Sequence, residues 1–203
     1  MRNDISFIQS ENAVFEGFFA NIGDTRREGL ELALQILPSE RVSLYANYAY
    51  TQATYRDAAE IFSIRADDQF AAQPLAGPND VEPGDRLPLV PGHQVKAGGL
   101  VRLPAGVDLG VDARYTGKQW LRGDEANETT PLDGYFVANV RAGLTRGAWE
   151  VSGVLSNVFN SHAAVFGTFN ENRRTGALER FLTPLTARSI KIVLRREFGG
   201  GER

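Results

Sequence analysis

The feature that most constrains this chain is a strict alternation of apolar and polar residues, which recurs in seven stretches of the sequence. In residues 107–116, Leu109 and Val111 share one parity, whereas Asp108, Asp112 and Arg114 share the other. The stretches are 30–36, 42–50, 94–103, 107–116, 136–144, 149–155 and 190–194, and charged residues within them occupy only one parity. A period of two places all apolar residues on one side of a strand. In a helix the same period would distribute them over every side, so that no apolar face would form. The sequence therefore predicts an all-β chain.

Short and long connections between these stretches alternate along the chain. Pro and Gly mark tight turns at 37–40, 103–106 and 145–148, because they fix the backbone angles of a short reversal. Long connections lie at 57–92, 120–133 and 160–186. In an up-and-down antiparallel sheet, this order places every tight turn at one end and every long loop at the other.

The expected strands are long enough to favour a membrane over water. We expect about eight strands, at 3–9, 14–36, 41–56, 93–103, 106–120, 134–145, 148–159 and 187–198, and the second could break near Gly23. Strands of soluble proteins are usually about 5–6 residues long, whereas about 9–11 tilted residues cross a bilayer. A Lys or Arg that faces lipid costs roughly 2–4 kcal/mol, which explains why the apolar parity carries no charge. The predicted fold is an antiparallel up-and-down transmembrane β-barrel segment.

Aromatic residues near the strand ends agree with a membrane. Tyr50, Tyr115 and Trp120 lie near the long-loop ends of their strands, and Trp149 and Phe198 lie near the tight-turn ends. Amphipathic rings gather at both membrane–water interfaces. We therefore predict these five residues as membrane-interface aromatics.

Composition excludes several other classes. The 203 residues hold 22 Lys and Arg against 25 Asp and Glu, and a formal charge of −3 argues against a nucleic-acid partner. The absence of Cys excludes disulfides, thiolate metal sites and a cysteine nucleophile. No Ser/His/Asp constellation or phosphate-binding glycine loop is present, and neither His93 nor His162 suggests a metal site. We expect no enzyme activity, no cofactor and no metal.

Five parts of the sequence stand out together: 21–32, 44–51, 83–88 with 91–94, 115–125 and Ser156-Asn157-Val158-Phe159-Asn160. They resemble the C-terminal barrel region of TonB-dependent outer-membrane receptors. The strongest is the last, which is similar to an Asn-Asn-Leu-Phe-Asp/Asn element before the last loop of that family. Their order and spacing cover nearly the whole chain.

The resemblance implies a role in transport across the outer membrane of a Gram-negative bacterium. Barrels of this family have 22 strands around a plug, so the chain would supply the last eight. The resemblance implies that the transported solute is scarce. A ferric siderophore is the favoured solute, and cobalamin or a carbohydrate are the alternatives. The implied partners are outer-membrane lipid and lipopolysaccharide, the rest of the barrel with its plug, and the barrel-assembly machinery, which reads the C-terminal strand. TonB would act only through the plug, which lies outside this chain.

The N-terminus carries no secretory signal, since Met1 to Ile8 alternates like a strand. We therefore expect a truncated or split gene, in which residues 1–198 form part of the barrel and residues 199–203 form a disordered tail. The family usually ends in an aromatic residue, and here five residues follow Phe198.

Loop residues are the candidates for ligand binding. Arg173, Arg174 and Arg180 in the last long loop could contact an anionic ligand such as a ferric siderophore. Seven acids in the first long loop could bind cations, although solvated loop surface is the favoured interpretation; they are Asp57, Glu60, Asp67, Asp68, Asp80, Glu82 and Asp85. Asp124, Glu125 and Glu128 are interpreted as solvated too. Six inward charges are interpreted as structural; they are Asp108, Asp112, Arg114, Glu150, Lys191 and Arg195.

Two alternatives stay open at this point. One is an autonomous eight-stranded outer-membrane barrel that serves as an anchor or an enzyme, since eight strands can close. The other is a soluble β-sandwich, whose strands also alternate.

Overall fold

The structure of this chain is a computed structural model that describes residues 1–198 except 11–12, 66–74, 173 and 175–176. The described chain is all-β with one 3-10 turn, η1 at Pro104–Gly106. The strands are β1 Ile5–Ser10, β2 Ala13–Asn21, β3 Thr25–Ser39, β4 Val42–Tyr55, β5 Ala59–Arg65, β6 Leu75–Val81, β7 His93–Leu103, β8 Val107–Thr116, β9 Tyr135–Arg146, β10 Trp149–Ser156, β11 Ala164–Asn172, β12 Ala177–Pro184 and β13 Ser189–Arg196. Among these residues, no helix is long and apolar enough to cross a membrane.

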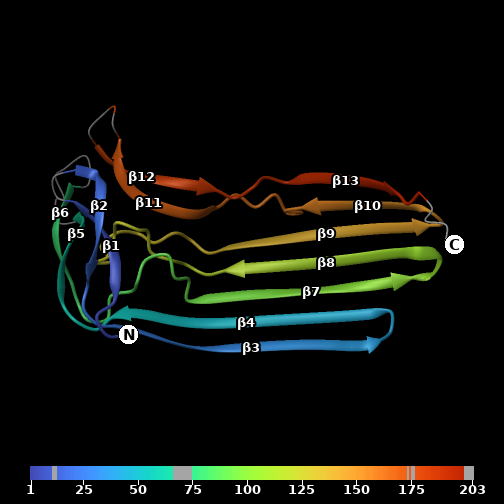
Figure 1. Cartoon of the computed structure of the whole chain (residues 1–203), viewed down its shortest axis with the longest axis horizontal. Coiled ribbons are helices and arrows are strands. Elements are labelled where there is room, and N and C mark those ends of the chain that lie inside the picture. The colour runs from blue at the N-terminus through green and yellow to red at the C-terminus, as the bar shows by residue number, and fades with distance from the viewer. Residues whose placement is uncertain (11–12, 66–74, 173, 175–176, 199–203) are drawn as a thin grey trace.

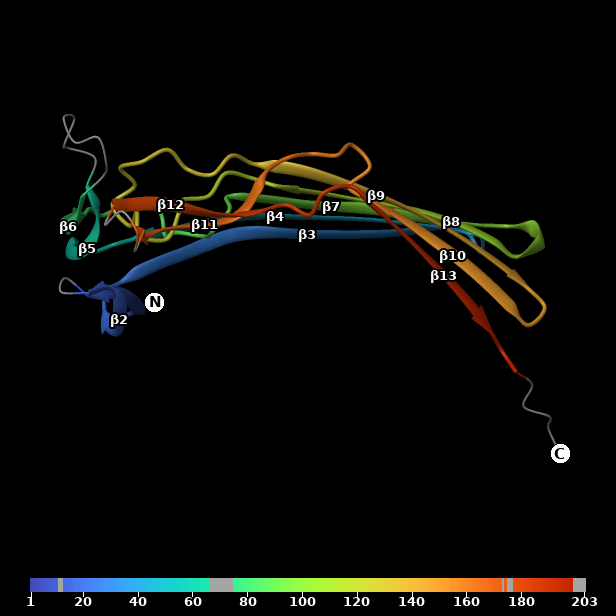
Figure 2. The ribbon, with the colours of Figure 1, turned by 90° about the horizontal axis from the view of Figure 1, so that it is seen from above.

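Seven strands form one antiparallel wall in the order β13-β10-β9-β8-β7-β4-β3. Three hairpins, β1–β2, β5–β6 and β11–β12, form separate two-stranded sheets at one end of the wall. The tight turns and the C-terminus lie at the other end, as Figure 1 shows. The view from above in Figure 2 shows that the wall is curved. The predicted separation of tight turns and long loops is confirmed.

The expected number of wall strands was wrong by one. The segment expected at 3–9 is β1, which pairs with β2 instead of joining the wall. The strand expected at 14–36 is two strands, β2 and β3, and the break lies at Gly23 with φ 85°. Hydrogen bonds from Asp4 N to Gly23 O and from Ile22 N to Asp4 O tie the first residues to this break. Alternation of apolar and polar residues predicts a strand but does not indicate which strand it pairs with. A strand of a loop hairpin and a strand of the wall therefore have the same sequence pattern.

Some predicted strands end earlier than expected, and two loops hold strands that the pattern did not reveal. The pairing of β8 with β9 ends at Thr116 and Tyr135, so residues 117–120 lie outside the wall. β10 ends at Ser156 because Asn157 adopts φ 50°, which a strand does not accommodate. The hairpins β5–β6 and β11–β12 lie within connections that we expected to be loops.

The apolar face of the wall is exposed rather than packed. One register row crosses all seven strands through Ile36, Leu44, Gly99, Val111, Val140, Leu155 and Ile190. Leu34 is 56% exposed and Ile192 is 71% exposed, although both belong to the predicted apolar parity. A sandwich would bury this face against a second sheet. The soluble sandwich is therefore wrong, and the face has the character of a surface that meets lipid.

The closed eight-stranded barrel is also wrong for the described residues. β3 and β13 lie at opposite edges of the sheet and do not pair with each other. The wall is therefore an open segment of a barrel.

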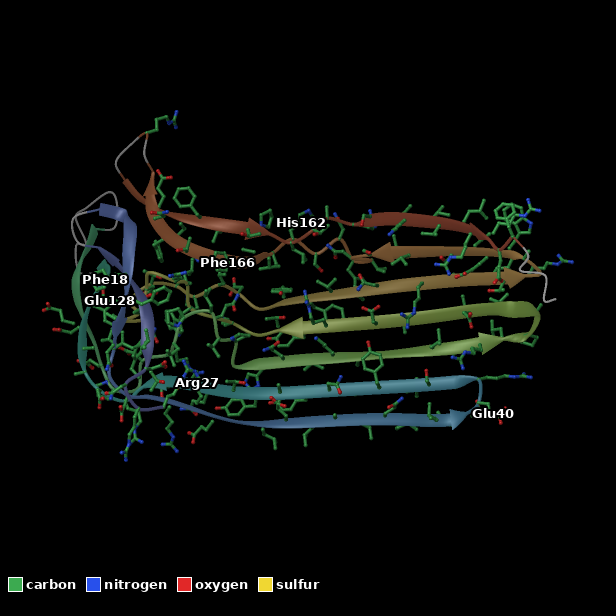
Figure 3. The ribbon with its side chains drawn as sticks, viewed as in Figure 1. Phe18, Arg27, Glu40, Glu128, His162 and Phe166 are labelled. Atoms are coloured by element: carbon green, nitrogen blue, oxygen red, sulfur yellow. The ribbon has the colours of Figure 1, made fainter. Side chains whose placement is uncertain are left out.

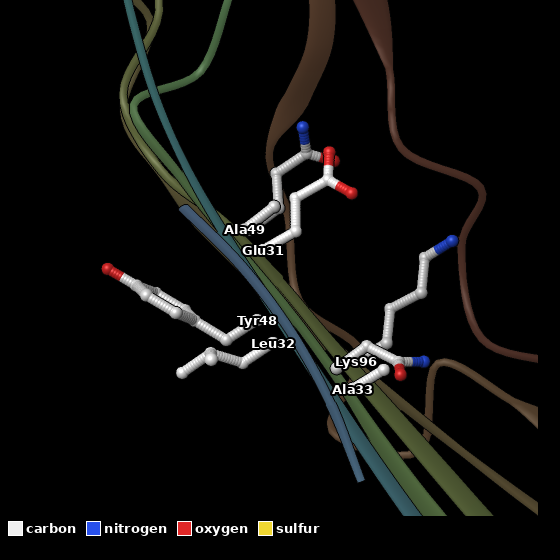
Figure 4. A pocket seen from close by; sticks show the side chains of 8 residues that line it. Glu31, Leu32, Ala33, Tyr48, Ala49 and Lys96 are labelled. Carbon is white, nitrogen blue, oxygen red and sulfur yellow. The ribbon is translucent and has the colours of Figure 1, made fainter. Parts of the chain in front are cut away.

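The opposite face of the wall carries the polar side chains and points inward. In Figure 4, Glu31 and Lys96 project to the side on which the later strands lie, whereas Leu32 and Tyr48 project to the other. Glu31, Ala49 and Lys96 help to line an open hollow of about 520 Å³. We call this polar side the inner face and the apolar side the outer face.

Inner-face side chains pack across glycines of neighbouring strands and form polar pairs. A Cβ on Gly98 would lie 2.7 Å from a ring carbon of Tyr45, and one on Gly110 would collide with Nε of Arg141. Only glycine leaves room for these two large side chains to lie flat on the sheet. Arg195 pairs with Glu150 at 3.1 Å, one of the pairs expected among the inward charges.

A cation placed on each face tests the assignment of inside and outside. We expect Leu34→Arg to lower the free energy of unfolding in phosphatidylcholine vesicles by roughly 2–4 kcal/mol, because Leu34 lies on the apolar outer face. Gln35→Arg, the matched control on the inner face, should cost less than about 1 kcal/mol. Denaturant titrations followed by tryptophan fluorescence measure both. Equal costs for the two variants would show that the faces are wrongly assigned.

Candidate functional site: the loop end of the wall

The long loops gather at one end of the wall and form the candidate recognition surface. Figure 3 shows Phe18, Arg27 and Glu128 at this end and Glu40 at the opposite, tight-turn end. Recognition residues are often carried by loops on a rigid scaffold.

Two small apolar clusters hold the loops together. The larger cluster joins the β2–β3 connection, the end of β4, the hairpin β5–β6 and the segment after it, and its buried residues are Ile22, Ala53, Tyr55, Ile61, Val81 and Leu87. The smaller cluster holds Leu121, Leu132 and Phe169, which brings β11 against the 117–134 segment. Burial of these side chains gives the loops cores of their own.

Asp124 organises the 117–134 segment. Its carboxylate is fully buried and accepts hydrogen bonds from Glu128 N at 2.8 Å, Thr129 N at 3.1 Å and Thr129 Oγ1 at 2.6 Å. Burial raises the pKa of Asp124 above its ordinary value, although the hydrogen bonds from Thr129 and Glu128 oppose the shift. The interpretation of Asp124 as a solvated acid was wrong; Glu128 is exposed as expected.

Asn127 joins this segment to residue 86 of the preceding loop. Its Oδ1 accepts from Arg86 N at 2.6 Å, and its Nδ2 donates to Arg86 O at 3.0 Å. Asn127 has φ 57°, a left-handed conformation that Asn tolerates better than most residues. The sequence analysis did not select Asn127, which stands in the sequence between the acids Glu125 and Glu128.

Asp4 anchors the first residues of the chain to β3. Its Oδ2 accepts from Thr25 Oγ1 at 2.6 Å and pairs with Nη2 of Arg27 at 2.9 Å. Burial acts to raise the pKa of Asp4, but the hydrogen bonds from Thr25 and Arg27 and the charge of Arg27 outweigh it. The net effect lowers the pKa below its ordinary value of 3.8.

Asn157 explains why the Ser156–Asn160 element is distinctive. Its side chain is 2% exposed, donates to Ser161 O and Thr186 O at 3.0 Å each, and accepts from Ser161 N at 2.9 Å. Its backbone N donates to Oδ1 of Asn139, whose Nδ2 donates to Asp112 at 2.7 Å. One asparagine therefore ties the end of β10 to β9 and to the segment that leads into β13.

Two acids of the first long loop accept hydrogen bonds from backbone N–H groups. Oδ2 of Asp57 accepts from Asp24 N at 2.7 Å, and Oδ2 of Asp85 accepts from Glu82 N at 2.8 Å. Asp67 and Asp68 lie outside the described residues. In the part of the chain that the structure describes, no three His, Asp or Glu side chains form a group that could hold a metal ion.

The three candidate arginines lie in or beside the β11–β12 hairpin. Arg180 in β12 is exposed and pairs in register with the buried Phe169. Arg174 is exposed in the turn of this hairpin, and Arg173 lies outside the described residues. The structure therefore places two of the three at the loop end, and their role in ligand binding stays a prediction.

The predicted interface aromatics lie at the two expected ends. The guanidinium carbon of Arg196 lies 5.0 Å from the ring centroid of Trp149 and 4.7 Å from that of Phe198, at the tight-turn end. Tyr50, Tyr115 and Trp120 line one hollow at the loop end. Their contact with membrane interfaces stays a prediction. His162 is exposed.

The lowered pKa of Asp4 predicts a dependence on pH. The stabilisation by Asp4 is fully present above its unfolded pKa near 3.8 and is lost as the pH falls through the lower folded value. We expect Asp4→Asn to cost about 1 kcal/mol of unfolding free energy at pH 7 and less at pH 2.5. Denaturant titrations at both pH values measure the difference. A cost that does not change with pH would contradict the Asp4–Arg27 ion pair.

Two of the asparagines at positive φ, Asn157 and Asn160, provide a matched pair of variants. Asn157→Ala removes three hydrogen bonds from a buried site and should cost about 2–3 kcal/mol of stability. Asn160 has a similar φ of 51° but accepts only one exposed side-chain hydrogen bond, from Arg188 N at 3.2 Å. Asn160→Ala should therefore cost about 1 kcal/mol or less. Similar losses in unfolding titrations would show that backbone conformation, not the buried contacts, makes Asn157 important.

Comparisons with known proteins agree with this architecture. Residues 2–158 match the family described as "TonB dependent receptor-like, beta-barrel". The chain is 28% identical over 153 residues to the ferrioxamine receptor of Yersinia enterocolitica. The aligned region covers 74% of this chain and 18% of the receptor.

Solved structures show the same fold at low identity. The siderophore receptor PiuA from Acinetobacter baumannii matches with a TM-score of 0.68 and 15% identity, over 95% of this chain and 24% of that one. The ferric yersiniabactin uptake receptor FyuA from Yersinia pestis matches with a TM-score of 0.64 and 16% identity, over 90% of this chain and 25% of that one. The chain thus spans about a quarter or less of its relatives' lengths. With most of its length matched, the chain belongs to the TonB-dependent receptor β-barrel family, whose members are transport receptors of the outer membrane and not enzymes.

Proposed function

We propose that this chain forms the C-terminal part of the barrel wall of a receptor that imports a ferric siderophore across the outer membrane. The observation that carries the proposal is the match to the ferrioxamine receptor, which extends over 74% of this chain. The structural neighbours support the same solute class, since their names refer to a siderophore, to ferric yersiniabactin and to ferric citrate.

In this proposal the wall and the loops have separate roles. The exposed outer face lies in the outer membrane, and the inner face lines the path through the completed barrel, where a plug gates it. The packed loop end meets the solute first. TonB acts through the plug, and the barrel-assembly machinery reads the C-terminal strand. Residues 1–198 act as one part of the barrel, and residues 199–203 form its tail.

The proposed ligand contacts are the arginines of the last long loop. A ferric siderophore that carries negative charge would be attracted by guanidinium groups, which also donate several hydrogen bonds in a fixed geometry. Arg174 and Arg180 are both exposed at the loop end, where such a solute would arrive. Arg173 is proposed with them from its position in the sequence.

Uptake of labelled iron tests this function. In iron-starved cells, the receptor that carries this chain should import radiolabelled iron supplied as ferrioxamine or another ferric siderophore. The variant Arg174→Gln/Arg180→Gln should reduce uptake at low solute concentration roughly a hundredfold, since each of the two lost charged hydrogen bonds costs roughly 1.5 kcal/mol. Arg146→Gln, at the tight-turn end, serves as the control and should transport normally. Failure to import any ferric siderophore, in cells where the receptor reaches the membrane, would refute the proposed solute.

A further inference from the structure

A second hollow lies at the loop end, separate from the β11–β12 arginines. It has a volume of about 360 Å³ and is built by the ends of β4, β7 and β8 together with the loop residues that follow them. Its most chemically distinctive lining residues are Tyr50, Arg86, His93, Tyr115, Lys118 and Trp120. Cationic and aromatic side chains thus meet in one hollow.

The register places this hollow on the outer face. Tyr50 pairs with His93, and Tyr50 has the same parity as Leu44 and Tyr48, so both members of the pair lie on the apolar side. Thr54 continues that parity along β4 and bridges to Arg86. Figure 4 shows Tyr48 on the opposite side of the sheet from Glu31 and Lys96. The hollow therefore opens toward the side of the wall that meets lipid.

Several contacts shape the hollow. Tyr48 Oη and His93 Nδ1 lie 2.9 Å apart, and the ring centroids of Tyr50 and His93 are separated by 5.1 Å. A Cβ on Gly92 would lie 3.6 Å from an Nη of Arg86, which places the guanidinium over the glycine. The neighbouring aromatic rings and the glycine thus hold the polar groups at the wall surface.

The charge in this hollow is positive. Arg86 and Lys118 supply two cations, and none of the lining residues is an acid. Asp133 pairs with Lys118 at 3.5 Å from outside the hollow, with both side chains largely exposed. Cations on a lipid-facing wall are costly within the hydrocarbon and favourable at the level of lipid headgroups. Tyr, Trp, Arg and Lys together at one level of a strand wall mark the headgroup region.

We propose that this hollow binds the phosphate of an outer-leaflet lipid headgroup. Arg86 forms the principal contact, because a guanidinium matches phosphate oxygens with two parallel hydrogen bonds. Lys118 adds a second charge, and the rings of Tyr115 and Trp120 pack against the sugar or glycerol part of the lipid. The inference rests on the proposed function only in that the outer face lies in the outer membrane.

Native mass spectrometry of the full chain in detergent micelles tests this proposal. The probes are lipid A with two phosphates, its fully dephosphorylated form and phosphatidylcholine. We expect lipid A to be retained most strongly. The variant Arg86→Gln/Lys118→Gln should weaken its retention at least about tenfold, since two charged contacts are lost. The matched control, Lys96→Gln/Arg114→Gln, removes two cations from the inner face and should retain lipid A like the parent chain.

The outcomes separate the possibilities clearly. Equal retention of lipid A and its dephosphorylated form would overturn the proposal, because phosphate would then contribute nothing. Equal losses in the two double variants would also overturn it and would indicate a general effect of charge. Displacement of lipid A by millimolar inorganic phosphate would assign the hollow to free phosphate instead of a lipid. Lipid binding at Arg86 without siderophore uptake would count against the proposed solute alone.

Discussion

Because lipid offers no hydrogen-bond partners, every backbone amide and carbonyl of a membrane wall must find its partner within the protein. The antiparallel ladder from β3 to β13 meets this requirement in every interior strand. The two edge strands have unpaired sides in the described chain, and a wall in lipid requires partners for both. The ladder also fixes the two faces, since side chains of paired residues share one side of the sheet.

The two faces follow from this ladder and explain the modest hydrophobicity of the chain. Only 42% of the residues are hydrophobic and the net charge is −3, values that by themselves suit a soluble domain. One face of each strand is apolar and exposed, as a surface toward lipid would be, and the other carries pairs such as Glu150 with Arg195. The inner face therefore holds most of the polar side chains of the wall. Gly98 and Gly110 allow Tyr45 and Arg141 to lie across the inner face.

The loop end is held together by side-chain contacts instead of a continuous strand ladder. Small apolar clusters and buried polar side chains give the long loops defined structures. Asp124, Asn127 and Asn157 each satisfy several backbone groups that no strand pairs. Such a packed loop end suits the proposed binding of a solute and, on the outer side, of a lipid headgroup, because its surface is preorganised.

The sequence by itself determined the strand class, the faces and the direction of the loops, because a period of two is a local property. Leu34 and Ile192 were assigned to the apolar face from parity alone, and the structure confirms this. Only the tertiary structure decided that β1 pairs with β2 and that Asp124 is buried. It also decided that Arg86 and Lys118 line one hollow. Strand partners and loop contacts join residues far apart in the chain, and local alternation carries no information about such pairings.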